Sequence, residues 1–181
     1  YYSRARNLHR AARAIVMEHS GRFPETVDGL SALPGIGRYT AAAVASYSFH
    51  QTVDIIGANT LRVQTRTLAL TGDPRTPGAQ RRVWARADDL AAGATKRFTA
   101  AEINQALMDL GATVCVPKAP RCEECPLARW CSGFQAGIAA QLPQSAPRPT
   151  ITEVTEATVA IACGQTYLLR QRQTGERWAG M

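Results

Sequence analysis

Apolar residues recur every three or four positions along most of residues 2–135, a period that predicts amphipathic helices rather than strands. In the first stretch, residues 2–19, the expected buried face combines Leu8, Ala11, Ala12, Ile15 and Val16. The same period predicts further helices over residues 27–33, 38–47, 60–70, 79–92 and 100–111. The chain is therefore expected to form a mainly α domain with no convincing strand before residue 135.

Residues suited to helix capping stand where several of these helices are expected to begin. Thr26 and Asn59 are predicted N-caps, because their side-chain oxygens can accept hydrogen bonds from the free N–H groups of a first turn. Thr99 and Glu102 have the spacing of a capping box, which predicts the start of the helix that follows them.

The tightest predicted turn lies between two helical patterns, in a run of proline and glycine. Its residues are Leu33, Pro34, Gly35, Ile36, Gly37 and Arg38. Proline fixes φ and glycine tolerates positive φ, so the chain can reverse here with its backbone uncovered by side chains. The free N–H groups of the next helix would then form an anion site suited to a phosphate. Binding to a backbone phosphate does not depend on the base sequence. The alternative is an ordinary glycine-rich helix–helix turn.

The charge of the chain favours a polyanionic partner. The 181 residues include 21 Lys and Arg against 14 Asp and Glu, a formal net charge of +7 that suits nucleic acid or an anionic membrane surface. Four arginines of the first predicted helix are interpreted as a solvated basic face, with DNA contact as the alternative: Arg4, Arg6, Arg10 and Arg13. We see no run of 18 apolar residues and no signal peptide, so we expect an intracellular, cytoplasmic protein with no membrane partner.

Four closely spaced cysteines are the strongest chemical signal in the chain. Cys115, Cys122, Cys125 and Cys131 are spaced C-x6-C-x2-C-x5-C. Four thiols at this density are typical of a tetrahedral zinc site or of a [4Fe–4S] cluster, and the spacing alone leaves both open. Cys163 lies apart from them and is predicted to be a buried strand residue.

The composition changes after the cysteines. Residues 141–149 are rich in Pro, Gln and Ser and predict an interdomain linker. Two short apolar stretches, residues 158–163 and 166–171, then predict a hairpin around Gly164 and Gln165. Two strands do not make a stable domain, so we expect the chain to be cut short at its C-terminus.

Together, the proline–glycine hairpin and the four cysteines of an otherwise helical chain resemble the helix-hairpin-helix DNA glycosylase superfamily, to which endonuclease III belongs. Within it, the chain is similar to the adenine DNA glycosylases of the MutY type. The similarity covers residues 1–135. Apart from the cysteines, it lies in four segments: Tyr1–Leu8, Phe23–Pro24, Leu33–Ala41 and Asn104–Gly111.

This resemblance implies a helix-hairpin-helix glycosylase region over residues 1–135, with its N-terminal helices missing from the chain. It favours a [4Fe–4S] cluster over zinc as the group held by the four cysteines. Residues 136–152 would be a linker, and residues 153–181 the truncated start of a small α/β Nudix-like domain, with Arg177–Gly180 early in it. The implied protein is a monomer that binds double-stranded DNA with mispaired adenine.

The implied activity belongs to base excision repair. Adenine opposite 8-oxoguanine or guanine is flipped out of the duplex, and its N-glycosidic bond is hydrolysed. This chemistry needs an acid for the leaving base and a carboxylate that stabilises an oxocarbenium-like sugar. Tyr39 would face the flipped nucleotide. Bifunctional relatives have Lys at the position of Tyr39, so a Schiff-base lyase reaction is not expected here.

The chain departs from the family in two places that matter for catalysis. The helix that supplies the acid precedes the first residue of this chain, and Gly57 stands where the family has its catalytic Asp. Asp54 is three residues earlier, an offset of ~10 Å in an extended chain, so it could substitute only after rearrangement. We therefore expect weak DNA binding with little cleavage.

Two alternative functions remain open at this point. A thymine mismatch DNA glycosylase is compatible with Tyr39, because such enzymes also have Tyr at this position. A non-catalytic lesion- or DNA-binding protein is favoured by Gly57.

Overall fold

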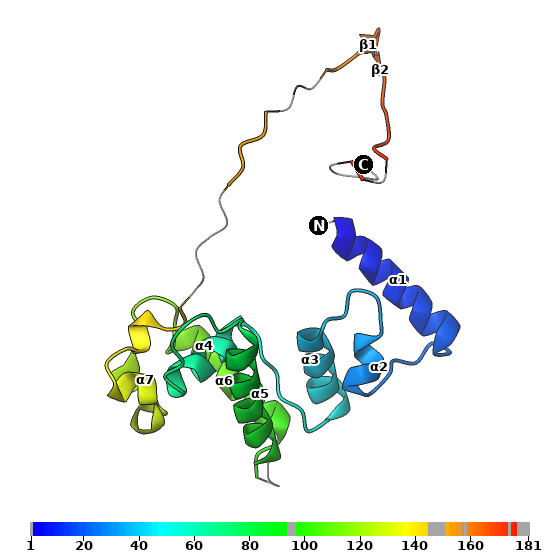
Figure 1. Cartoon of the computed structure of the whole chain (residues 1–181). Helices are drawn as coiled ribbons and strands as arrows, with labels where there is room; N and C mark the ends of the chain where they lie inside the picture. Colours follow the sequence, from blue (N-terminus) through cyan, green and yellow to red (C-terminus); the bar gives the residue numbers. More distant parts are fainter. Residues whose placement is uncertain are drawn as a thin grey trace. The chain divides into compact units, whose positions relative to one another are not determined.

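Helices make up the first of the two units into which the chain divides, Tyr1–Ala146 and Pro147–Met181. The computed structural model describes residues 2–93, 97–144, 151–155, 157, 159–173 and 175–176. The α-helices are α1 (Tyr2–Glu18), α2 (Val27–Ser31), α3 (Arg38–Phe49), α4 (Ala58–Thr67), α5 (Pro77–Ala92), α6 (Ala100–Thr113) and α7 (Ser132–Gln135) (Figure 1). The short 3₁₀ helices are η1 (Cys122–Glu124), η2 (Ala128–Trp130) and η3 (Ala139–Gln141). The mainly helical prediction is confirmed.

The first three helices pack around a small apolar core. Its buried members are Ala11, Ile15, Leu30, Leu33, Ala41 and Ala45. Thr26 caps α2 as predicted, because its Oγ1 accepts a hydrogen bond from Gly29 N at 3.2 Å. The predicted buried face of α1 is wrong at three positions, since Leu8 is 74% and Val16 66% exposed, and Ala12 is exposed as well. Only the part of this face around Ala11 and Ile15 is covered by α2 and α3.

Helix α4 lies at the centre of the remaining helices and contacts α5, α6 and α7. Its predicted start is wrong by two residues. The N-cap is Gly57, and Asn59 lies inside the first turn, where its Oδ1 accepts from Arg62 Nη2 at 2.8 Å. The predicted capping box of α6 is confirmed: Thr99 N donates to Glu102 Oε2 at 2.8 Å, and Glu102 N donates to Thr99 Oγ1 at 3.2 Å.

A buried asparagine joins α6 to α3 and to the extended connection between α3 and α4. Asn104 is 4% exposed, and its Nδ2 donates to Ser46 Oγ at 3.2 Å and to Val53 O at 2.8 Å. Its Oδ1 accepts from Ile55 N at 3.1 Å. Because most of these groups are shielded from water, their mutual hydrogen bonds fix the segment that leads to Gly57.

The second unit contains a short antiparallel hairpin. Strands β1 (Ala162–Cys163) and β2 (Thr166–Tyr167) pair in the register Ala162↔Tyr167 and Cys163↔Thr166. The strands are shorter than predicted, and Cys163 is exposed rather than buried. The predicted strand start at Thr158 and the segment Arg177–Gly180 lie outside the described residues.

None of the helices in the described part of the chain combines the length and apolar character that crossing a membrane requires.

Candidate functional site

The turn between α2 and α3 leaves the first turn of α3 open. Gly35 has φ +78°, and a Cβ there would lie only 2.5 Å from Asn7 Cβ of α1, so both conformation and space require glycine. Gly37 is the N-cap of α3; it offers no side-chain cap, and nothing lies within 4 Å of the place where its Cβ would be. The backbone N–H groups at the start of α3 are therefore accessible to an anion.

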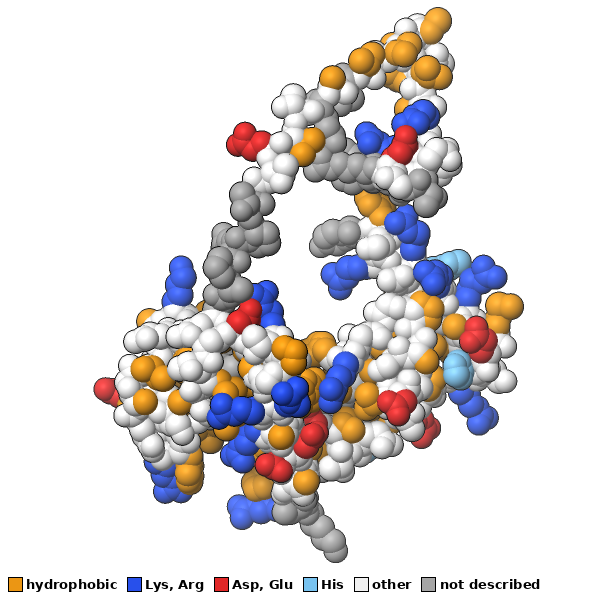
Figure 2. Space-filling view, viewed as in Figure 1, with side chains coloured by type: hydrophobic (Ala, Val, Ile, Leu, Met, Phe, Trp, Pro, Cys, Tyr) orange, Lys and Arg blue, Asp and Glu red, His pale blue; other side chains and the backbone are white. Residues whose placement is uncertain are grey.

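Basic side chains are spread over the helical unit, with fewer acidic ones among them, on the face shown in Figure 2. The four arginines of α1 are all exposed, in agreement with the solvated basic face that was predicted: Arg4, Arg6, Arg10 and Arg13.

Tyr39 lies against Gly57, the position at which the sequence lacks the expected carboxylate. A Cβ on Gly57 would be 2.6 Å from Tyr39 Cε2, so the phenol ring covers this glycine. Tyr39 is 46% exposed, and among the described residues its hydroxyl group makes a single, long contact of 4.0 Å, with Met108 Sδ of α6. The ring is thus held loosely, and the Tyr39 side chain has room to move outward.

Asp54 is buried beside α5. It is 9% exposed, and its Oδ2 has no hydrogen-bond partner. Burial and the neighbouring Asp88 carboxyl together raise the pKa of Asp54 to about 6, against the opposing charge of Arg38. A proton shared with Asp88 would supply the missing hydrogen bond. In the described residues no hydrogen bond or ion pair joins Asp54 to Tyr39 or Gly57.

Replacing Asp54 with Asn is expected to remove a pH-dependent loss of stability. The folded-state pKa of about 6 lies above the ordinary value of 3.8, so the folded state holds a proton that the unfolded chain has released. The stabilisation is complete below about pH 4 and is lost as the pH rises through 6. Asp54→Asn should therefore be ~1–3 kcal/mol more stable than wild type near neutral pH. Urea unfolding from about pH 4.5 to 7.5 tests this, with the exposed Asp89→Asn as control; parallel profiles for wild type and Asp54→Asn would refute it.

Two buried arginines of α4 hold the segments around the cysteines. Arg66 is 1% exposed; its Nε donates to Leu142 O at 2.8 Å. Its Nη atoms donate to Val116 O at 2.8 Å, to Pro117 O at 3.1 Å, and to the carbonyl oxygen and Sγ of Cys115, each at 3.2 Å. These bonds tie the cysteine-rich segment to both α4 and the end of the helical unit.

Arg62, one turn before Arg66, reinforces the same connection. Its Nε donates to Cys115 O at 2.7 Å, and its Nη2 donates to Gly111 O at 2.6 Å. Burial lowers the pKa of the Arg62 guanidinium, and the charge of Arg66 acts in the same direction, while Cys115 opposes it. The spacing of these arginines was visible in the sequence, but their burial was not.

The four cysteines predicted as metal ligands line one cavity. Its walls are otherwise mostly apolar and include Val63, Leu110, Val114, Leu127 and Phe134. Cys131 is buried, whereas Cys115, Cys122 and Cys125 are partly exposed. Burial raises the pKa of the Cys122 and Cys125 thiols. Across the described part of the chain, no three His, Cys, Asp or Glu side chains are gathered as ligands of one metal ion.

The cysteine spacing leaves both a zinc ion and a [4Fe–4S] cluster open, and these two groups need their sulfur ligands in different places. A zinc ion needs its four sulfurs at about 2.3 Å from one point. A [4Fe–4S] cluster instead takes one thiolate at each of four separate irons. The four cysteines line one cavity without being gathered around one point in the described residues, and they could hold such a cluster.

Comparison with known proteins gives relatives for most of the helical unit. The family described as "Helix-hairpin-helix motif" matches residues 18–47. The adenine DNA glycosylase of Mus musculus is 40% identical over 154 residues, which cover 84% of this chain and 29% of that protein. The adenine DNA glycosylase of Homo sapiens is 40% identical over 136 residues (75% and 24%), and that of Mycobacterium tuberculosis 41% over 137 residues (76% and 43%). The chain thus spans less than half the length of these relatives.

Solved structures agree in fold. A thermostable thymine-DNA glycosylase superposes with a TM-score of 0.62 at 31% identity, covering 74% of this chain and 59% of that one. Endonuclease III in a non-covalent complex with DNA gives a TM-score of 0.57 at 22% identity, with coverages of 75% and 60%, a likeness of fold alone. These findings confirm the resemblance drawn from the sequence. The chain is a homologue of the adenine DNA glycosylases, with a helix-hairpin-helix motif in an endonuclease III-like fold.

Proposed function

We propose that this chain is the DNA-binding and base-excising part of an adenine DNA glycosylase of base excision repair. Its substrate would be double-stranded DNA with adenine mispaired with 8-oxoguanine or guanine, and it would act as an intracellular monomer. The observation that carries the proposal is the open N-terminus of α3, where Gly37 leaves the backbone uncovered and Arg38 is exposed. Such a site can hold a DNA phosphate while Tyr39 faces the flipped nucleotide.

Gly37→Ala is expected to weaken binding to duplex DNA about tenfold, because a methyl group would stand between the phosphate and the N–H groups of α3. The fold should survive, since φ at Gly37 is −86° and the space around it is empty. Fluorescence anisotropy with a labelled duplex measures the Kd. Gly78→Ala is the matched control, because Gly78 of α5 also has nothing within 4 Å of its Cβ position. Equal Kd values for wild type and Gly37→Ala would contradict DNA binding by the hairpin.

The same proposal assigns a [4Fe–4S] cluster to Cys115, Cys122, Cys125 and Cys131. Two observations support it: the four thiols share one cavity, and Arg66 directs a buried guanidinium at Cys115 Sγ. In the described residues no carboxylate pairs with Arg66, and a buried cation without a counter-charge is costly. Thiolates around a cluster would supply the missing negative charge and cross-link the segment from Cys115 to Cys131.

For the chain as a whole, we propose the helix-hairpin-helix region as residues 1–135, a linker as 136–152, and the start of a Nudix-like domain as 153–181. This boundary rests on the change in composition and on the resemblance to the family.

Two other functions also have observations in their favour. Removal of thymine is favoured by the 31% identical thymine-DNA glycosylase and by Tyr39. Non-catalytic DNA binding is favoured by Gly57, which supplies no carboxylate. Excision assays on adenine and thymine mispairs, run beside the Kd measurement, separate the three functions.

A further inference from the structure

An arginine at the hairpin stacks on an aromatic ring of a distant helix. Arg38 is the first residue of α3, directly after Gly37, and its Cζ lies 3.3 Å from the centroid of the Trp84 ring in α5. Trp84 is half-buried and Arg38 is exposed. The two residues are 46 positions apart in the sequence, which gives no sign of this contact, yet the contact joins the predicted phosphate site to α5.

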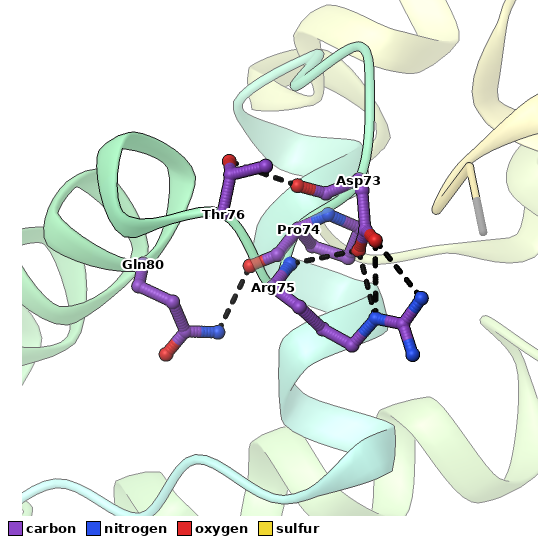
Figure 3. A network of polar contacts seen from close by, with 5 residues as sticks. All are labelled: Asp73, Pro74, Arg75, Thr76 and Gln80. Atoms are coloured by element: carbon purple, nitrogen blue, oxygen red, sulfur yellow. Dashed lines mark hydrogen bonds and ion pairs between the residues drawn. The ribbon is translucent and has the colours of Figure 1, made fainter. Parts of the chain in front are cut away.

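The Trp84 ring is itself held by a chain of hydrogen bonds. Its Nε1 donates to Gln80 Oε1 at 3.1 Å, and Gln80 Nε2 donates to Pro74 O at 2.9 Å. Figure 3 shows Gln80 reaching the turn that precedes α5, where Arg75 Nε donates to Asp73 Oδ1 at 3.0 Å and Thr76 Oγ1 donates to Asp73 O at 3.0 Å. The orientation of the indole is therefore fixed by the turn that begins its own helix.

Stacking constrains the guanidinium without using its donors. In the described residues no N–H group of Arg38 makes a hydrogen bond or ion pair with another side chain or the backbone. A planar guanidinium held by its face keeps its N–H edge available, and this edge matches two oxygens of a phosphate. A cation held over an indole ring also loses less side-chain freedom when it binds a ligand.

We propose that Trp84 is a positioning residue for DNA binding, which orients Arg38 toward a backbone phosphate next to the one held by the hairpin. The inference rests on the proposed function and deepens it, because it extends the DNA-binding surface from the hairpin to α5. The partner is the phosphate backbone of duplex DNA, without regard to base sequence.

The test measures the Kd of the full chain for an unmodified labelled duplex over a series of salt concentrations. Trp84→Leu is expected to raise the Kd about fivefold and to lower the slope of log K against log[salt] by ~0.9, the value for one phosphate contact. Trp84→Phe keeps a ring under Arg38 and should retain most of the wild-type slope. Trp130→Leu removes a similar stack, in which Arg129 Cζ lies 3.7 Å from the Trp130 ring, and should leave the slope unchanged.

A double-mutant cycle separates positioning from a general structural role. In the Arg38→Ala background, Trp84→Leu should have no further effect on the Kd or on the salt slope. A wild-type slope for Trp84→Leu, or an equal loss with and without Arg38, would overturn the inference. If Trp84→Leu does not fold, Trp84→Gln, which also lacks an aromatic ring, takes its place in the same comparison.

The Gly37→Ala result distinguishes a failure of DNA binding by the hairpin from a failure of the role of Trp84. If wild type does not bind the duplex, or Gly37→Ala binds as wild type does, DNA binding by the hairpin fails and the inference fails with it. If Gly37→Ala weakens binding while Trp84→Leu keeps the wild-type slope, only the role of Trp84 is refuted.

Discussion

If the chain acts as proposed, replacing Gly57 with Asp is expected to increase adenine excision at least ~100-fold, because it would place a carboxylate where the proposed reaction develops positive charge on the sugar. The backbone around position 57 is already well fixed. Gly57 N donates to Thr60 Oγ1 at 2.8 Å, and Thr60 Oγ1 donates to Ile55 O at 2.9 Å. The new side chain needs the space now taken by the Tyr39 ring, 2.6 Å from the Cβ position. Since Tyr39 is half-exposed and loosely held, its ring can turn outward at low cost.

Single-turnover kinetics on a duplex with adenine opposite 8-oxoguanine measure this effect. Gly57→Asn is the matched control, because it displaces Tyr39 equally but carries no charge. A rate for Gly57→Asp equal to that of Gly57→Asn, with DNA still bound, would show that a carboxylate at this position is not the missing group. The non-catalytic function would then be the better description of the chain.

Most helices of the first unit were predictable because short-range patterns determine them. The hydrophobic period located α1, α5 and α6 within a few residues, and Thr26 and the Thr99–Glu102 pair marked helix starts correctly. Asn59 was misassigned because its side chain accepts a hydrogen bond from Arg62 and is not available for capping. Which apolar residues of α1 are covered depends on where α2 and α3 pack, and that information is not local.

The contacts around the candidate site were less predictable, since they join residues far apart in the chain. The hairpin and the cysteines are compact motifs with characteristic spacing, so sequence reasoning found them. The burial of Arg66 among carbonyl groups and the pairing of Asp54 with Asp88 depend on tertiary packing. An asparagine on an otherwise apolar helix face was the only hint of the bonds made by Asn104.

Arg66→Met is expected to destabilise the helical unit by at least about 3 kcal/mol, because methionine fills similar space but supplies none of the guanidinium donors. The carbonyl groups of Leu142, Val116 and Pro117 would each lose their hydrogen bond from Arg66, and the bond to Leu142 is fully buried. Cys115 O would keep its bond from Arg62, so the loss falls mainly on the segment after it. Urea unfolding at a fixed pH measures the change, and the exposed Arg129→Met is the control, expected within about 0.5 kcal/mol of wild type.

The same variant tests the link between Arg66 and the proposed cluster. If thiolates surround a [4Fe–4S] cluster, removing a buried cation next to Cys115 leaves their negative charge unbalanced, and iron should be lost together with stability. Iron and sulfide counts and the absorbance near 400 nm, taken on anaerobically purified protein, should therefore fall in Arg66→Met and stay at the wild-type level in Arg129→Met. Full iron content with reduced stability would restrict Arg66 to holding carbonyl groups, and wild-type stability with full iron content would contradict both roles. Because no carboxylate pairs with the buried Arg66 in the described residues, and thiolates of the proposed cluster would balance its charge, iron and stability are expected to be lost together.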